Sequence, residues 1–256
     1  MQSSLELNRR QVLALAAGAF AAGAAGRVKA DTVTVRPAIV ELFTSQGCSS
    51  CPPADAFMAE VRAMKDVVAL TYNVDYWDYR GWRDTLAAPE NSKRQYKYAK
   101  ARGDMDVYTP QMIIDGASHV VGSQKPAVIA AIRNSLSNPP PIWIPVTITA
   151  NDAEFQITVD EAPPDTPAPI ASLWFVSVAP RMPVEIEKGE NAGQKIVYLN
   201  VVRKLVPVGM WHGERTTLAL PKDSVMTEDS TSCVALLQMK PLGRILGCAV
   251  WGRLSS

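Results

Sequence analysis

The sequence has few of the residues that build metal sites and disulfide frameworks. Only 4 cysteines and 2 histidines occur among 256 residues. The histidines, His119 and His212, stand at no metal-ligand spacing from the cysteines. An excess of charge of one sign is also missing, since the formal net charge is +1. Because such a chain does not attract a phosphate backbone, we expect no nucleic-acid partner.

The apolar run near the start of the chain, from Val12 to Gly26, is too short to span a bilayer. It follows the basic pair Arg9-Arg10, is rich in Ala and Gly, and ends near small residues suited to cleavage after Ala30. These features predict a signal peptide at residues 1–30, of the twin-arginine type. An uncut membrane anchor is the alternative. We expect a periplasmic or secreted protein with no membrane attachment after cleavage.

Cleavage would remove four basic residues and one acidic residue, leaving a formal charge of −2. The remaining chain is long enough to bury one large core or two modest cores, and we predict two domains. No internal repeat or low-complexity tract occurs, and the sequence does not indicate the oligomeric state.

Residues 36–138 carry the pattern of an α/β domain with one sheet. Apolar, β-branched runs predict strands, and helical spacing predicts helices. The expected strands are 38–44, 67–74, 111–114 and 119–121, and the expected helices are 52–65 and 125–137. Residues 75–103 combine an aromatic patch with a polar helical stretch, so we predict an insertion over the core.

A different pattern follows the stiff segment Asn138-Pro139-Pro140-Pro141, which we interpret as a linker. Residues 141–256 contain short alternating runs separated by turn residues, a pattern typical of a β-sandwich. The runs are 143–149, 154–159, 173–178, 196–202, 216–220, 234–238 and 245–250. The predicted fold is therefore an α/β domain followed by a mainly β, sandwich-like domain.

The motif with the most specific chemistry is Cys48-Ser49-Ser50-Cys51. It precedes a predicted helix, whose unpaired amides and dipole stabilise a thiolate on the first cysteine. Pro52 and Pro53 fit the first helical turn because its amides have no internal partner. We expect Cys48 to be the exposed attacking sulfur and Cys51 the shielded sulfur that resolves a mixed disulfide.

This region resembles the thioredoxin-like superfamily. The run from Ile39 to Thr44 leads into the cysteine pair much as in glutaredoxin and thioredoxin, and Thr109-Pro110 resembles the Thr-Pro step ahead of their third core strand. The resemblance implies a cis bond before Pro110, facing the cysteines and helping to hold extended substrate. No tryptophan precedes Cys48, and serines replace the usual residues between the cysteines, so the direction of electron flow stays open.

A narrower resemblance covers nearly the whole mature chain. The segments 47–55, 75–78 and 189–193 look like an uncharacterised bacterial secreted family catalogued as a domain of unknown function. That resemblance implies no activity.

Glu41 lies seven residues before Cys48 and has two interpretations. By the same resemblance it stands near the place where thioredoxins keep a buried carboxylate that accepts a proton from the second cysteine. A register shift of one residue would instead expose it as a plain strand-end carboxylate.

The aromatic residues of the insertion either line a peptide groove beside Cys48 or pack within the insertion. They are Tyr76, Trp77, Tyr79 and Trp82.

Cys233 and Cys248 lie on two consecutive predicted strands around a turn at residues 240–243. A suitable register would place them opposite each other, and we predict a structural disulfide between them. Two buried free thiols are the alternative, because a loop of different length shifts the partners.

These observations predict a thiol-disulfide oxidoreductase that acts through Cys48 and Cys51, with Thr109, Pro110 and Glu41 as accompanying site residues. Its partner would be a thiol or disulfide protein or a small thiol, and we expect no cofactor and no metal. Two other hypotheses remain. One is a non-catalytic binding module in which the pair is a structural disulfide, and the other is a metal-delivery protein that uses the pair with a histidine.

Overall fold

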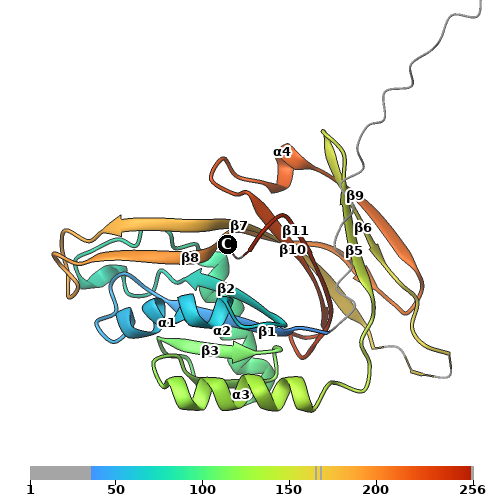
Figure 1. The fold of residues 1–256 in the computed structure, drawn as a ribbon, viewed down its shortest axis with the longest axis horizontal. Coiled ribbons are helices and arrows are strands. Elements are labelled where there is room, and N and C mark those ends of the chain that lie inside the picture. Colours follow the sequence, from blue (N-terminus) through green and yellow to red (C-terminus); the bar gives the residue numbers. More distant parts are fainter. Residues whose placement is uncertain (1–35, 165, 168, 255–256) are drawn as a thin grey trace, which may run out of the picture.

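The computed structural model describes residues 36–164, 166–167 and 169–254, which form a mostly β structure with few helices (Figure 1). The predicted signal peptide at residues 1–30 lies outside the described residues. None of the described helices is long and apolar enough to cross a membrane.

The described strands form two sheets. The larger is a mixed, eight-stranded sheet in the order β11-β10-β7-β8-β2-β1-β3-β4, and the smaller has the order β5-β6-β9. The strands are β1 Ala38–Thr44, β2 Val67–Asn73, β3 Gln111–Ile114, β4 Ser118–Val121, β5 Val146–Ala150, β6 Glu154–Val159, β7 Ala171–Glu185, β8 Lys195–Trp211, β9 Thr216–Pro221, β10 Ser232–Met239 and β11 Ile245–Trp251. The helices are α1 Pro52–Arg62, the 3-10 helix η1 Asp78–Arg80, α2 Pro89–Arg102, α3 Lys125–Ser137 and α4 Lys222–Val225.

β1 lies at the centre of the N-terminal part of the large sheet. It pairs in parallel with β2 and antiparallel with β3. All seven of its residues are buried, as expected for a strand covered on both faces. Val40 and Leu42 pack against α1 and α3 on one face, whereas Ile39 and Phe43 pack into a core on the opposite face. The predicted strands and helices of this part are confirmed, with α1 ending at Arg62.

The predicted polar helical stretch is α2, which runs across the core opposite α1. Pro89 occupies the first turn, and Gly103 ends the helix with a left-handed φ of 82°, a conformation that glycine adopts without steric cost. Its buried side chains are mostly polar, which explains why it shows no apolar stripe. They are Asn91, Ser92, Arg94, Gln95, Tyr98 and Ala99.

The N-terminal and C-terminal parts of the chain share one sheet. β8 pairs in parallel with β2 at Thr71, which faces Val201. Side chains reinforce this junction, since Thr71 Oγ1 donates to Leu199 O at 2.6 Å and Asn200 Nδ2 donates to Ala69 O at 2.9 Å. One hydrophobic cluster also contains residues of β1, β2, β8, β10 and β11. The two parts on either side of the predicted boundary at residues 138–141 thus share one sheet and one hydrophobic cluster. That each part folds as a separate domain stays a prediction.

Each of the seven predicted C-terminal runs contains a strand, although the first strand, β5, begins at Val146 and not at residue 143. β7 and β8 extend well beyond the predicted ends, to Glu185 and Trp211, and form a long antiparallel hairpin. The three-stranded sheet packs its apolar side chains against β7, β10 and β11. Phe155 of β6 and Phe175 of β7 meet there with ring centroids 5.4 Å apart. This arrangement of two packed sheets is sandwich-like.

The predicted disulfide between Cys233 and Cys248 is wrong, because both are buried free thiols. The register places Cys233 opposite Trp251 and Cys248 opposite Leu236. The two cysteines therefore occupy opposite faces of the sheet, in two different hydrophobic clusters. Burial raises the pKa of each thiol to about 12.

Candidate functional site

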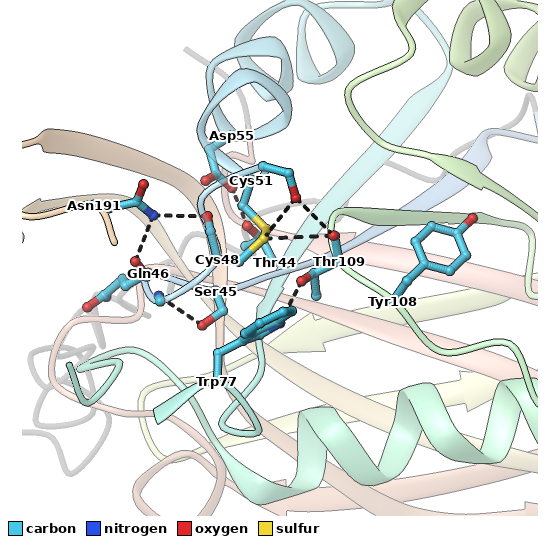
Figure 2. The surroundings of a disulfide bond; sticks show 12 residues. Thr44, Ser45, Gln46, Cys48, Cys51, Asp55, Trp77, Tyr108, Thr109 and Asn191 are labelled. Atoms are coloured by element: carbon cyan, nitrogen blue, oxygen red, sulfur yellow. Dashed lines mark hydrogen bonds between the residues drawn. A yellow bond between two sulfur atoms is a disulfide. The ribbon is translucent and has the colours of Figure 1, made fainter. Parts of the chain in front are cut away.

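Cys48 and Cys51 form a disulfide at the start of α1, with their Cα atoms 5.4 Å apart (Figure 2). Cys51 is the N-cap residue, and Pro52 and Pro53 occupy the first turn as expected. The loop is tightly wound, since the amide of Cys48 donates to Ser45 O at 3.2 Å and the amide of Cys51 donates to Cys48 O at 3.1 Å. The pair thus lies where the helix dipole favours a negatively charged sulfur.

Both cysteines are buried. Cys48 is 2% exposed and Cys51 is 0% exposed, whereas Ser49 and Ser50 between them are exposed. The prediction of an exposed Cys48 is therefore wrong for this oxidised state. Part of the cover comes from the insertion, whose backbone passes so close to Gly47 that an added Cβ would lie 3.1 Å from Trp77 O.

Thr109 and Pro110 lie directly beside the disulfide, and the cis bond implied by the resemblance is present between them. Cys48 Sγ lies 3.7 Å from Thr109 O, and Ser50 Oγ donates to the same carbonyl at 3.3 Å. Ser50 Oγ also lies 3.4 Å from Cys48 Sγ. A hydroxyl at this place can turn its proton to a thiolate once the disulfide opens.

Trp77 connects the insertion to the same place. Its indole Nε1 donates to Thr109 Oγ1 at 2.7 Å (Figure 2). This hydrogen bond attaches the aromatic segment of the insertion to the Thr109-Pro110 loop beside the disulfide. Trp77 stacks on Tyr79, and the guanidinium of Arg80 lies over both rings. Tyr79 is 76% exposed, so this aromatic group extends from the disulfide to the surface.

Asp55 is a site residue that the sequence reasoning missed. It lies one helical turn after Cys51, is 2% exposed, and accepts a 2.7 Å hydrogen bond from Thr44 Oγ1 (Figure 2). Its Oδ2 has no hydrogen-bond partner among the described residues. Burial raises the pKa of this carboxyl from 3.8 to about 8, the Thr44 hydrogen bond lowers it, and the charge of Asp84 raises it. The spacing of four residues from Cys51 was the available signal, because such residues share a helix face.

Glu41 does not take part in the cysteine site. Successive strand residues point to opposite faces, and Glu41 lies on the face of β1 away from α1. It is fully buried, accepts a 2.7 Å bond from Arg94 Nε, and also accepts a hydrogen bond from Tyr98 OH. Both earlier interpretations are thus wrong, because Glu41 is neither beside Cys51 nor exposed at a strand end. It anchors α2 to the sheet.

The loop that carries Cys48 is held from the C-terminal part of the chain. Asn191 lies in the turn between β7 and β8, is 1% exposed, and donates through Nδ2 to Gln46 O and to Cys48 O, each at 2.9 Å. Arg80 and Glu190 form an ion pair of 2.9 Å beside it. The segment 189–193, which we noted only as a motif, is therefore part of the site.

A second set of contacts holds the same loop from the insertion. Asp84 Oδ2 accepts hydrogen bonds from Gln46 N at 2.8 Å and from Asn73 Nδ2 at 3.0 Å. Trp82 Nε1 donates to Gln46 Oε1 at 2.7 Å. Burial raises the pKa of Asp84, although these hydrogen bonds lower it. Two segments far apart in the sequence, the insertion and the β7–β8 turn, thus meet at Gln46, two residues before the first cysteine.

The histidines lie elsewhere. His119 Nδ1 is 2.9 Å from Tyr108 OH, and its Nε2 is 3.4 Å from Asp104 Oδ2. His212 is exposed after β8. The described part of the chain holds no group of three or more His, Cys, Asp or Glu residues arranged for a metal ion.

Two solved structures resemble this fold. The X-ray crystal structure of protein AGR_C_4864 from Agrobacterium tumefaciens is 32% identical, with a TM-score of 0.72, over 84% of this chain and 94% of that chain. HBP35 of Porphyromonas gingivalis is 12% identical, with a TM-score of 0.59, over 85% of this chain and 75% of that chain, and shares the fold alone.

The search of curated proteins found no match. The family model described as "Protein of unknown function (DUF1223)" matches residues 39–238. That match covers most of the chain, and the Agrobacterium protein extends the likeness over nearly its own full length. The chain therefore belongs to the DUF1223 family.

Proposed function

We propose that this protein is a periplasmic or secreted thiol-disulfide oxidoreductase whose N-terminal part is thioredoxin-like. The observation that carries the proposal is the placement of the Cys48–Cys51 disulfide at the start of α1, between the Thr109-Pro110 step and the buried carboxyl of Asp55. These groups supply a nucleophile, a place for substrate backbone and a proton carrier, which are the parts that disulfide exchange requires.

The topology of the N-terminal part supports the thioredoxin-like assignment. The strand order β2-β1-β3-β4 places the parallel pair beside an antiparallel hairpin. α1 follows β1 and α3 follows β4, and both pack on the same face of the sheet. This arrangement is an α/β domain with one sheet, as predicted, and it supports the resemblance to the thioredoxin-like superfamily.

In the proposed reaction, a thiolate of the partner attacks Cys48 Sγ and forms a mixed disulfide. The Cys48–Cys51 bond breaks, and its electron pair passes to Cys51 Sγ, which takes a proton. A second partner thiolate then attacks the partner sulfur of the mixed disulfide and releases Cys48 as a thiolate. The sum is one protein disulfide plus two thiols giving one protein dithiol plus one partner disulfide. The reverse direction reduces a partner.

Asp55 is the group suited to exchange a proton with Cys51. With a pKa of about 8, its carboxyl is largely protonated at neutral pH and still loses the proton readily. It can therefore donate to the leaving Cys51 thiolate in one direction and accept from the attacking thiol in the other. Ser50 supports the thiolate of Cys48 in either direction through its hydroxyl.

The burial of both sulfurs favours a second candidate, in which the pair is a structural disulfide of a binding module. A structural bridge would resist reduction by glutathione in the folded protein, whereas an exchanging pair would equilibrate with it. Reduction of the folded protein by glutathione therefore distinguishes the two candidates.

The experiment treats the reduced, folded protein with a disulfide-bonded model protein and follows mixed disulfides by non-reducing gel and mass spectrometry. We expect exchange by the native protein, trapped mixed disulfides through Cys48 in Cys51→Ala, and none in Cys48→Ala. The double variant Cys233→Ala/Cys248→Ala is the matched control and should exchange normally, since those thiols are buried. A native reduced protein that forms no mixed disulfide and does not reduce the model protein while folded would contradict the proposal.

Export is tested separately. The full chain expressed in a bacterium with a twin-arginine system should appear in the periplasm, with Asp31 as its first residue. Replacing Arg9 and Arg10 by lysine should retain the uncut chain in the cytoplasm.

A further inference from the structure

The turn between β7 and β8 reaches the cysteine loop from a part of the chain more than 140 residues away. Asn191 provides the contact. Its amide nitrogen donates to the carbonyls of Gln46 and Cys48, and its Oδ1 accepts a 3.1 Å bond from Gln194 Nε2. All the polar atoms of a buried side chain are therefore engaged, which fixes its orientation.

The two acceptors lie in the loop that carries Cys48, and the backbone conformation of this loop determines the geometry of the disulfide. One acceptor is the carbonyl of Cys48 itself, which also receives the amide of Cys51. The neighbouring turn is fixed as well, because an added Cβ at Gly189 would lie 3.2 Å from Arg80 O and because Glu190 pairs with Arg80. The hairpin is thus a firm support for the loop.

We propose that Asn191 is a positioning residue that stabilises the Cys48–Cys51 disulfide relative to the dithiol, so that the β7–β8 hairpin belongs to the redox site. The inference rests on the proposed function in one respect only, that the disulfide opens and closes reversibly in the folded protein. It gives the C-terminal part of the chain a role in setting the reduction potential.

The physical reason is the reciprocity of coupled interactions. In the oxidised protein, the disulfide and the Asn191 hydrogen bonds restrain the same loop. When the disulfide opens, the loop gains freedom and makes the Asn191 bonds less completely. Anything that strengthens the restraint therefore favours the closed form, because it raises the effective concentration of one thiol at the other. Loss of the restraint should make the disulfide easier to reduce.

The test measures the equilibrium constant between the full mature protein and glutathione at pH 7, with the reduced fraction followed by alkylation and mass spectrometry. We expect Asn191→Ala to shift the equilibrium about tenfold towards the dithiol, which is about 30 mV for this two-electron couple. Gln194→Ala, at an exposed position, removes only the bond that orients Asn191 and should shift it in the same direction by less. This second variant decides the question if Asn191→Ala does not fold.

Asn200→Gly is the matched control. Asn200 is also a buried asparagine of the C-terminal part that donates through Nδ2 to a backbone carbonyl, that of Ala69, and its φ of 49° suits glycine. This variant should lower the free energy of unfolding and leave the glutathione equilibrium unchanged. An equal shift in Asn200→Gly would mean general loosening and would overturn the inference, as would unchanged equilibria in Asn191→Ala and Gln194→Ala.

The outcome also separates this inference from the proposed function. A shifted equilibrium in a protein that exchanges with glutathione but not with the model protein disulfide would support Asn191 as a positioning residue and count against the oxidoreductase. A protein that exchanges with the model protein disulfide, but whose glutathione equilibrium is the same in Asn191→Ala, would support the oxidoreductase and contradict the role of Asn191. A disulfide that never equilibrates with glutathione while the protein is folded contradicts both.

Discussion

The indole of Trp77 and the hydroxyl of Thr109 are joined by a 2.7 Å hydrogen bond beside the Cys48–Cys51 disulfide. The bond connects the insertion with the loop of the cis proline, and the adjacent Cys48 is 2% exposed. We therefore expect the strength of this contact to affect how readily a reagent reaches Cys48.

Trp77→Phe should speed reduction of the disulfide by a bulky phosphine, by about three- to tenfold, since it keeps an aromatic ring and removes one hydrogen bond worth about 1 kcal/mol. The rate is followed by alkylation of the released thiols. Trp211→Phe is the control, because its indole also donates a hydrogen bond, to Asp160 O, far from the site. Equal rates in the native protein and Trp77→Phe would show that this bond does not limit access.

Asp55→Asn should flatten the dependence of stability on pH. The folded-state pKa of about 8 lies above the ordinary 3.8, so the folded state binds more protons, and Asp55 destabilises the fold progressively as pH rises from about 4 to 8. The loss is on the order of several kcal/mol. Urea unfolding of the oxidised protein at pH 5, 7 and 9 measures it. Parallel profiles for Asp55→Asn and the native protein would contradict the prediction.

Breaking the buried pair of Glu41 and Arg94 should destabilise the fold without affecting the redox equilibrium. Arg94→Met leaves a fully buried carboxylate unpaired and should cost about 3–5 kcal/mol in the free energy of unfolding. The double variant Arg94→Met/Glu41→Leu should recover much of that loss. The glutathione equilibrium of this double variant should match that of the native protein. A shift as large as that expected for Asn191→Ala would show that Glu41 influences the cysteine pair.

Cys233 and Cys248 should stay unmodified when the native protein is treated with iodoacetamide at pH 8, because burial raises the pKa of each thiol to about 12. Under unfolding, non-reducing conditions, two thiols per chain should react. Finding none would mean that the two cysteines are oxidised and that the register of β10 and β11 differs from that described.

The elements of the fold could be predicted because local patterns specify them. The apolar run of β1 and the alternation in β5 and β6 indicate strands without reference to the rest of the chain. The joining of β8 to β2 could not be predicted, since it depends on a single register pair, Thr71 with Val201, that has no local signal. The predicted ends of β7 and β8 also came too early, because β-bulges interrupt the alternation of apolar and polar residues in both strands.

Short motifs predicted the location of the cysteine pair and of the cis bond, but the residues around them could not be predicted. Cys48, Cys51 and the cis bond before Pro110 follow from short motifs. Glu41 was placed wrongly because its distance along the chain does not reveal which face of β1 it occupies. Asp55 and Asn191 are distinguished by their burial and their tertiary contacts, and neither property can be derived from residue type and spacing alone.

The junction of β2 and β8 also determines what would happen to a shortened chain. Without residues after 138, β2 would become an open edge, with unpaired amides and carbonyls along a strand rich in β-branched residues. The face of β1 that carries Ile39 and Phe43 would lose its apolar cover at the same time. Such a fragment would pair edge to edge with its own copies and form aggregates, even though it keeps both cysteines of the site.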